Sequence, residues 1–282
     1  MKFHLSFWIC VFAMSLFPLV GCSDADGDGG TGGAAGTGGT AGTGGTAGTG
    51  GTGGQPEVRS YEMLATAFNP GGLDLPLEGA RFCEVSTDNC VTTNSSGLAT
   101  LDVAANQEVT ITIEKEGYGP YVTGDVTDET FGPEGGSGPW PAQWRMYADA
   151  ELEVMAGHLQ ADYPWTGGIV GLLRWPSPNP GVTFMPVGST IDAVGESFYF
   201  DAETMQYSLD LEATTRAHFL SLYPLAEGGF TEVTPGEHQF ELGGTAGNCR
   251  ASWGWPGDAP NRMRVPVLEG YATYGSMTCD DQ

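Results

Sequence analysis

Hydrophobic and polar residues alternate along most of the chain after Val58, in short runs that Gly, Pro, Asn and Asp separate. A period of two is typical of strands that bury one face. The clearest run is 108–115, where three branched apolar residues, Val109, Ile111 and Ile113, occupy one face. The pattern predicts short antiparallel strands linked by turns.

One segment departs from this pattern and predicts a helix over 149–160. Asp149 can cap it, and Leu152, Met155 and Leu159 recur at helical spacing. The Gly- and Pro-rich segment 131–141 predicts a loop. The other expected strands are 80–85, 98–103, 168–174, 181–187, 196–201, 206–211, 217–223, 236–242, 249–255, 262–268 and 271–279. The pattern therefore predicts an all-β fold class, with two β-rich bodies of antiparallel strands joined by a short helix.

Three sequence pieces occur in order in the first half: 79–82 (GARF), 95–101 (SSGLATL) and 109–118, which ends in Gly-Tyr. This order resembles the carboxypeptidase regulatory-like, or transthyretin-like, β-sandwich family over roughly 57–130. Segments 168–170, 180–184 and 233–238 resemble the same sandwich more loosely. The resemblance implies one sandwich in 55–147. It implies a second in 148–282 after the connector helix, with an unrelated β domain there as the alternative.

The first 21 residues have the layout of an export signal, with Lys2 followed by an uncharged apolar run from Leu5 to Val20. The run ends in LVGC, at Cys22, which resembles a bacterial lipobox. That resemblance implies a signal peptide over 1–21 and a palmitate-type acyl anchor on Cys22. With Ser23 next, it favours the outer membrane of a Gram-negative bacterium. The alternative is an ordinary secretory signal whose apolar run simply ends at Cys22.

Residues 22–54 are expected to form an acidic collar and a disordered linker. Sixteen of the 45 glycines fall in 27–54, in hexads such as GGTAGT. A chain of this composition cannot bury enough apolar surface to fold, and 28 residues should span about 30 Å as a coil. Asp24, Asp26 and Asp28 imitate half of a calcium loop, but the twelfth position is Ala35 rather than a glutamate.

The chain carries 35 acidic and 10 basic residues, a formal charge of -25. This charge excludes nucleic acid as a partner, because no basic groove can be built. Both halves share the acidity, with 14 acids and 4 bases in 55–147 and 18 acids and 5 bases in 148–282. Asp125, Asp128 and Glu129 are the best loop cluster for calcium, although a solvated acidic loop is the favoured interpretation. No cofactor is expected, and Arg262 and Arg264 should meet some of the acids.

Four cysteines remain once Cys10 leaves with the signal and Cys22 is acylated. An even number in an exported chain predicts disulfides, and four cysteines allow three connectivities. We favour Cys83–Cys90 and Cys249–Cys279, because each pair lies within one expected sandwich. The rival interpretation is a metal site, which no Cys-x-x-Cys pair or nearby histidine supports.

The histidines do not form a catalytic set. His238 and Glu241 have the His-x-x-Glu spacing of zinc carboxypeptidases, but no histidine follows to supply a third ligand. On a strand, positions three apart also point to opposite faces. His158 lies near the end of the expected helix, and His218 lies in an expected strand. We therefore predict neither a metal site nor an enzyme.

Six tryptophans remain after the signal, and several stand beside Pro or Gly: Trp140, Trp144, Trp165, Trp175, Trp253 and Trp255. Exposed indoles bind sugars or anchor protein partners, whereas buried ones fill cores. The sequence predicts a non-enzymatic envelope lipoprotein that is anchored to a membrane by lipid and displays sandwiches to an envelope protein or glycan. The alternatives are a carbohydrate-binding module that uses these tryptophans and an enzyme of unrecognised type.

Overall fold

The computed structural model describes residues 57–69, 73–127, 142–175, 180–189, 193–201, 204, 206–215, 218–220 and 223–280. All of them belong to one compact unit, Gly53–Gln282. The expected export signal, the expected acyl anchor at Cys22 and the expected linker lie outside the described residues, as do Asp128, Glu129 and Trp140. No helix in the described part is long and apolar enough to cross a membrane.

The first lobe, as we name residues 57–127 and 142–146, consists of strands. They are β1 (Val58–Ala67), β2 (Leu75–Pro76), β3 (Arg81–Glu84), β4 (Cys90–Thr92), β5 (Leu98–Ala104), β6 (Glu108–Lys115), β7 (Tyr118–Val126) and β8 (Ala142–Met146). The predicted strand 108–115 is present with the same bounds. Its predicted inner face is confirmed, since Val109, Ile111 and Ile113 are all buried.

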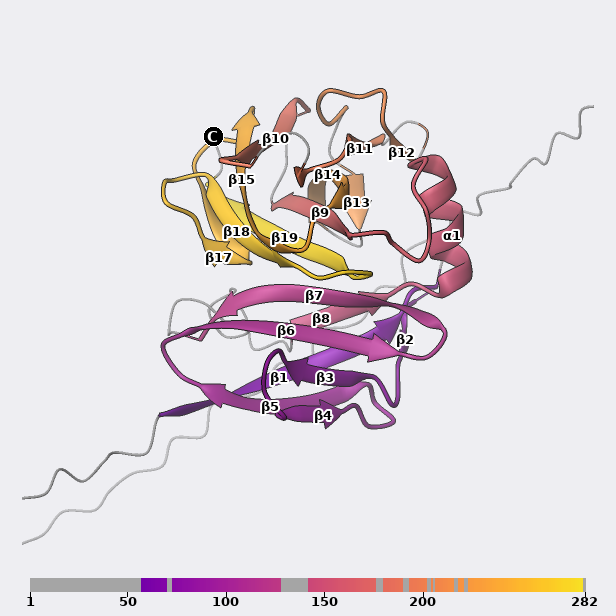
Figure 1. Ribbon diagram of the computed structural model, residues 1–282, viewed down its shortest axis with the longest axis vertical. Coiled ribbons are helices and arrows are strands. Elements are labelled where there is room, and N and C mark those ends of the chain that lie inside the picture. The colour runs from indigo at the N-terminus through magenta and orange to yellow at the C-terminus, as the bar shows by residue number, and fades with distance from the viewer. Residues whose placement is uncertain are drawn as a thin grey trace, which may run out of the picture. The chain divides into compact units, whose positions relative to one another are not determined.

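Helix α1 (Asp149–His158) leads to the second lobe, residues 168–280. Its strands are β9 (Gly168–Trp175), β10 (Val182–Val187), β11 (Ser197–Asp201), β12 (Gln206–Ser208), β13 (His218–Leu220), β14 (Tyr223–Val233), β15 (Gly236–Gly244), β16 (Cys249–Trp253), β17 (Trp255–Pro256), β18 (Arg262–Val267) and β19 (Ala272–Cys279). The all-β, sandwich-like fold class with one short helix is thus confirmed (Figure 1).

The described strands form three sheets. One has the order β2-β1-β5, with β8 also paired to β1, and another has the order β10-β15-β18-β17. The largest runs β12-β11-β14-β9-β19-β7-β6-β3-β4, with β13 on β14 and β16 on β19, so it contains strands of both lobes. The expectation of purely antiparallel sheets is wrong at three pairings. β8 lies parallel to β1, and β19 lies parallel to both β7 and β9, because long connections bring these strands together.

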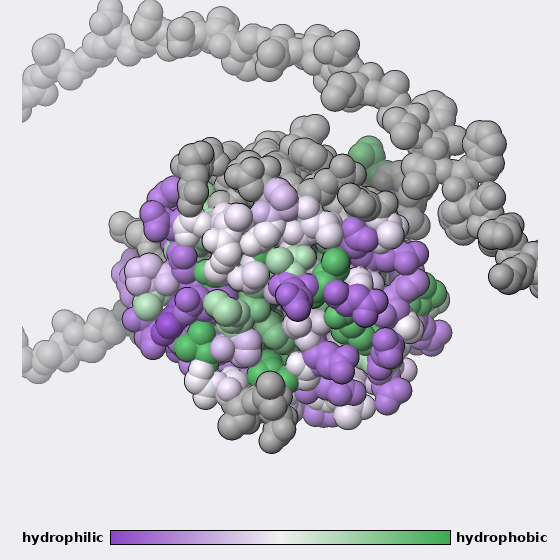
Figure 2. All heavy atoms as spheres, turned by 90° about the horizontal axis from the view of Figure 1, so that it is seen from above, coloured by the Kyte–Doolittle hydropathy of each residue, from purple (hydrophilic) through white to green (hydrophobic). Residues whose placement is uncertain are grey.

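Two hydrophobic clusters form the core. The first contains Tyr61 and Phe82 of the first lobe together with Ile169, Phe198 and Ala272 of the second. The other cluster lies within the second lobe. On the face shown in Figure 2, hydrophobic residues form small patches among hydrophilic ones. Because the first cluster contains residues of both lobes, each lobe covers apolar surface of the other. The division into two separately folding domains at residue 147 stays a prediction.

The helix begins at Asp149, the residue predicted to be its cap, so the observed cap lies one residue earlier. The N-cap is Ala148, whose N–H donates to the Glu151 carboxylate at 3.0 Å, so Asp149 is not the cap. Asp149 is instead the first helical residue, and its carboxylate accepts a hydrogen bond from the Tyr163 hydroxyl at 2.5 Å. The Asp149 carboxylate therefore bonds to Tyr163 and does not cap the N-terminus of the helix.

Both predicted disulfides are present. Cys83–Cys90 joins β3 to β4, and Cys249–Cys279 joins β16 to β19. Each bond connects cysteines that face each other across two antiparallel strands. The disulfides therefore hold strand pairs within a lobe and do not link the lobes.

Candidate functional site at the lobe junction

The tryptophan side chains that the structure describes are buried or half-buried, so they do not form an exposed aromatic surface for a sugar. Trp144, Trp165 and Trp255 are 6%, 5% and 8% exposed. Trp253 is half-buried, and its ring stacks on Trp144 at 5.6 Å between centroids. Trp175 belongs to β9, but its side chain lies outside the described part of the structure. A sugar-binding platform would consequently have to use Trp140 or Trp175.

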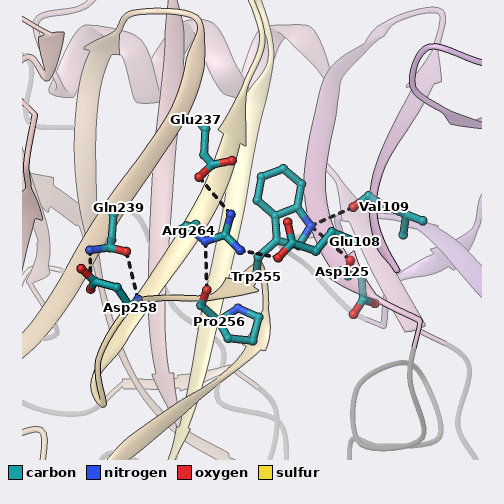
Figure 3. Close-up of polar contacts among 9 residues, drawn as sticks. All are labelled: Glu108, Val109, Asp125, Glu237, Gln239, Trp255, Pro256, Asp258 and Arg264. Atoms are coloured by element: carbon teal, nitrogen blue, oxygen red, sulfur yellow. Dashed lines mark hydrogen bonds and ion pairs between the residues drawn. The ribbon is translucent and has the colours of Figure 1, made fainter. Parts of the chain in front are cut away.

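Trp255 crosses from the second lobe to the first. Its indole N–H donates to the backbone carbonyls of Val109 and Asp125, both at 3.1 Å (Figure 3). Gly254 makes this contact possible, because its φ of 97° lies in the region that glycine adopts more readily than other residues. The strand β16 accordingly ends at Trp253, before the predicted end at residue 255. Gly124 receives the ring, since a Cβ there would lie 2.6 Å from a ring atom of Trp255. Two glycines thus allow one indole to fasten the lobes together.

Arg264 completes the contact around this indole. Its guanidinium lies 5.5 Å from the centre of the Trp255 ring and forms ion pairs with Glu237, at 3.0 Å, and with Glu108 of the first lobe. Its Nε donates to the Pro256 carbonyl at 3.0 Å (Figure 3). A guanidinium over an indole is an attractive arrangement, strengthened where water is excluded. Arg264 therefore connects both lobes.

Arg262, the other arginine of β18, also forms ion pairs with acidic residues, as the sequence predicted. Arg262 pairs with Glu241 at 2.6 Å and with Asp258 at 3.1 Å. Arg262 holds the pKa of the Asp258 carboxyl below its ordinary value. Asp258 is exposed, and Arg262 and Glu241 are half-buried at the surface, so the pairs contribute little to stability and serve mainly to keep the strand surface charge-balanced.

Backbone contacts add to the junction. Ala272 and Thr273 of β19 pair in parallel with Tyr121 and Val122 of β7. The Thr123 hydroxyl donates to the Tyr274 carbonyl at 2.8 Å. These bonds continue one sheet from lobe to lobe. We conclude that the junction positions the two lobes as a single body.

An open groove with a volume of about 430 Å³ lies beside the junction. Val85 and Thr110 line it from the first lobe, and the second lobe contributes Pro235, Gly236, Glu237, Trp255, Pro266, Val267 and Leu268. The strand edge here does not accept another strand, because Pro266 has no N–H and its carbonyl accepts from the Thr273 hydroxyl at 2.9 Å. A partner in the groove would therefore bind through side chains.

The candidate chemical residues lie apart. His238 is buried in β15, where its Nε2 faces the Thr234 carbonyl at 2.8 Å and its Nδ1 faces the Ser189 hydroxyl at 3.2 Å. A carbonyl only accepts, so Nε2 carries the proton and Ser189 donates to Nδ1. Glu241 pairs with Arg262 and does not meet His238. His158 is exposed at the end of α1, and His218 lies in β13.

Within the part of the chain that the structure describes, no group of three or more His, Cys, Asp or Glu side chains could hold a metal ion. The Asp125 carboxylate accepts from the N–H of Val126 at 2.7 Å. The favoured solvated acidic loop at Asp128 and Glu129 stays a prediction, with calcium as its alternative, because those two residues lie outside the described ones.

Alkaline pH should weaken the junction through Tyr271, whose hydroxyl donates to Glu114 of the first lobe. Burial, and then the Glu114 carboxylate, raise the pKa of Tyr271 from its ordinary 10 to about 12. Because the folded-state pKa is raised, this stability is fully present below pH 10 and is lost as pH rises towards 12. The free energy of unfolding, measured by urea titration at each pH, should therefore fall less steeply from pH 10 to 12 in Tyr271→Phe than in the wild-type protein. Glu114→Gln should reduce the slope by less, since burial is the larger cause. Slopes equal to wild type in both variants would contradict the assignment.

The comparisons with known proteins leave the family open. No protein-family model and no curated protein matches the sequence. Weakly similar solved structures include the TIE protein of Bacillus anthracis, at 11% identity and a TM-score of 0.22, with 79% of this chain and 34% of that one covered. The major pilin of Streptococcus pyogenes has the same identity and TM-score, with 80% of this chain and 99% of that one covered. GBS52, the minor pilin of Streptococcus agalactiae, has 11% identity and a TM-score of 0.18, with 79% of this chain and 97% of that one covered. The chain thus spans about a third of the TIE protein, and likenesses this weak carry no conclusion about its function.

Proposed function

We propose that this chain is an acylated envelope protein that displays a two-lobed β body as a non-enzymatic binding module, with an extended protein segment as its ligand. Cys22 would hold the lipid, and residues 27–54 would set the reach of the body from an outer membrane. The carboxypeptidase regulatory-like resemblance of the first lobe belongs to this proposal, as a non-catalytic sandwich. The observation that carries the binding role is the groove at the lobe junction.

The groove suits a polypeptide with apolar side chains. Its surface combines Val85, Leu268 and two prolines with one acidic side chain, Glu237. Two hydrogen bonds hold the Trp255 indole in the wall of the groove, so the groove keeps its shape when no ligand is bound and little conformational entropy is lost on binding. Pre-organised apolar surface with a few polar groups at its rim is the usual composition of a peptide-binding site.

A glycan fits this groove less well. Sugars stack on the open face of an aromatic ring, but Arg264 covers one side of the Trp255 ring and the ring packs on the backbone at Gly124. The exposed fraction of Trp255, 8%, leaves no face for a sugar ring. The glycan hypothesis consequently depends on tryptophans other than Trp255.

An enzymatic role also has little support in the described residues. The contact that most resembles a nucleophile and its base is Ser189 with His238. A backbone carbonyl, that of Thr234, holds the second ring nitrogen, rather than the carboxylate that would stabilise a protonated imidazole. This arrangement is that of a structural histidine, which fixes the loop before β15.

A photocrosslinking amino acid at position 237 in the full-length protein tests the groove in cells that make it. We expect a discrete adduct that is reduced at least about tenfold by Leu268→Ser, because a lost apolar anchor costs about 1.4 kcal/mol or more. The matched control is the same crosslinker at Val154, an exposed position on α1. Identical adducts from both positions, or an adduct that Leu268→Ser leaves unchanged, would contradict binding in the groove.

Acylation of Cys22 is tested by growing cells with an alkyne-bearing palmitate analogue. The wild-type protein should take up label, and Cys22→Ala should lose it, because only the cysteine thiol at the end of the signal can be acylated. Cys10→Ala, which alters a cysteine inside the signal, should retain the label. Label that persists in Cys22→Ala would refute the anchor without affecting the groove.

A further inference from the structure

The two disulfides differ in how readily a thiol in solution can reach them. Cys83 and Cys90 are half-buried, whereas Cys249 and Cys279 are 9% and 5% exposed. Exchange between a thiol and a disulfide requires a thiolate to approach one of the two sulfur atoms, so its rate depends on access. Cys83–Cys90 is therefore the disulfide on which an external thiol can act while the protein stays folded.

This bond also lies at the edge of the largest sheet. Cys90 belongs to β4, a strand of three residues that follows β3 at the end of the sheet order (Figure 1). Among the described strands, β4 pairs only with β3, through Cys83–Cys90 and two other residue pairs. Segments with few contacts open locally at a low cost in free energy. Breaking the disulfide should therefore release one short strand and leave the interior strands paired.

An arginine side chain contacts one sulfur of this disulfide. Arg81 and Cys83 are two residues apart on β3, so their side chains lie on the same face of the strand. Cys90 faces Cys83 across the strand pair, and the Arg81 guanidinium donates to the Cys90 Sγ at 3.0 Å. A positive charge beside a cysteine stabilises its thiolate form. Because a stable thiolate leaves faster, Cys90 is the leaving group that the geometry favours.

The charge of Arg81 is not taken up by a neighbouring acid. The Glu84 carboxylate accepts from the Asn89 amide at 3.0 Å. Glu114 faces Arg81 across β3 and β6, and it accepts from the Tyr271 hydroxyl. Within the residues that the structure describes, no ion pair joins Arg81 to a carboxylate, and its hydrogen bond goes to sulfur. The guanidinium is thus free to stabilise a thiolate.

We propose that Cys83–Cys90 is a site of thiol–disulfide exchange, at which an external dithiol forms a mixed disulfide with Cys83. A thiolate of the dithiol attacks the Cys83 Sγ, the bond between the two cysteines breaks, and its electron pair passes to the Cys90 Sγ beside Arg81. The second thiolate of the dithiol then attacks the first dithiol sulfur, which releases the Cys83 thiolate and the oxidised dithiol. Two electrons and two protons pass to the protein, and the reverse reaction restores the bond.

The Cys249–Cys279 bond takes no part in this exchange, because both of its cysteines are buried. The site is separate from the groove at Glu237 and Leu268. The proposal therefore does not rest on the binding function proposed above.

The test is reduction of the full-length folded protein, purified in a non-ionic detergent, at pH 8. The probes are reduced dithiothreitol, a small dithiol, and reduced thioredoxin, a protein dithiol. After an acid quench and alkylation, mass spectrometry of peptides should show free Cys83 and Cys90 while Cys249–Cys279 is still intact. Reduction by either probe supports the site, and the faster probe at equal concentration identifies the class of donor. Loss of both disulfides together, or of neither before the protein unfolds, would overturn the proposal.

A trapping experiment tests the direction of attack. Thioredoxin that lacks its second active-site cysteine cannot complete the exchange, so a mixed disulfide should accumulate on the protein. We expect this adduct on Cys83, because Arg81 stabilises Cys90 as the leaving group. An adduct found on Cys90 instead would refute the assigned direction.

Three variants test the arginine. Arg81→Gln should lower the equilibrium constant for reduction of Cys83–Cys90 by dithiothreitol at least about threefold, because the thiolate loses its neighbouring charge. Arg81→Lys, which keeps the charge, should recover most of that loss. Arg250→Gln alters an exposed arginine that adjoins Cys249 in β16, and it should leave the constant unchanged. Equal constants in Arg81→Gln and the wild-type protein would contradict the role of Arg81.

Discussion

Replacing Trp255 with alanine is expected to lower the free energy of unfolding by about 3 to 5 kcal/mol, the range for truncating a buried aromatic side chain. The indole is 8% exposed, and it packs on Gly124 and beneath Arg264. Its loss also leaves the Val109 and Asp125 carbonyls without their indole donor. The effect should be large because a single side chain joins the lobes through packing, hydrogen bonding and a cation–π contact.

Urea denaturation monitored by circular dichroism measures this loss. Trp255→Phe separates the contributions, because it keeps a ring but removes the N–H that the two carbonyls share. We expect it to cost about 1 to 3 kcal/mol, the penalty for a buried acceptor without its donor. Val154→Ala, at an exposed position on α1, is the control and should change stability by less than about 0.5 kcal/mol. A change in Trp255→Ala as small as that of the control would show that the indole does not stabilise the junction.

The same experiment reports whether the lobes unfold together. In the wild-type protein the junction and the shared hydrophobic cluster favour a single transition. Trp255→Ala removes the indole's packing and hydrogen bonds between the lobes but leaves the β7–β19 pairing and each lobe's own strands in place. A transition that becomes broader or splits in this variant is therefore the expected sign of lobes that have begun to unfold separately.

Most strands could be predicted from the sequence because each buries one face. β7 and β14 are two strands that the pattern did not predict, and each has a physical reason. β7 was not predicted as a strand because it lies inside the large sheet between β6 and β19, with most of its residues buried on both faces, so its sequence does not alternate. In β14, the close approach of Val170 and Phe198 requires Gly229, and glycines interrupt any apolar pattern.

The candidate sites could be predicted only in part. Trp255 stood out as an aromatic residue beside Gly and Pro, but its hydrogen bonds to Val109 and Asp125 join residues 146 and 130 positions apart. Contacts of that range depend on how the lobes meet, which local patterns do not encode. The buried Glu227 of β14, whose carboxylate accepts a hydrogen bond from the Tyr207 hydroxyl, was not singled out at all. Its signal was a single acid in an otherwise uncharged segment, LAEGGF, at a position where a strand inside a sheet buries its side chains.

The two disulfides should differ in their contribution to stability, and the difference follows from the loops that they close. Cys249 and Cys279 are separated by 30 positions, and Cys83 and Cys90 by 7. Loop-closure entropy gives about 3.6 kcal/mol for the longer loop and about 2.4 kcal/mol for the shorter one. The longer loop ends on β19, the strand that pairs with β7, β9 and β16, so loosening it should also disturb the central sheet.

Replacing Cys249 and Cys279 together with alanine should therefore destabilise the protein more than the matched Cys83→Ala and Cys90→Ala pair. Alanine is the suitable replacement, because Cys249 and Cys279 are 9% and 5% exposed and a serine hydroxyl would be buried there. Urea midpoints of the two double variants and the wild type, measured without reductant, provide the comparison. If Cys83–Cys90 proves the more stabilising of the two, loop length does not govern their contributions.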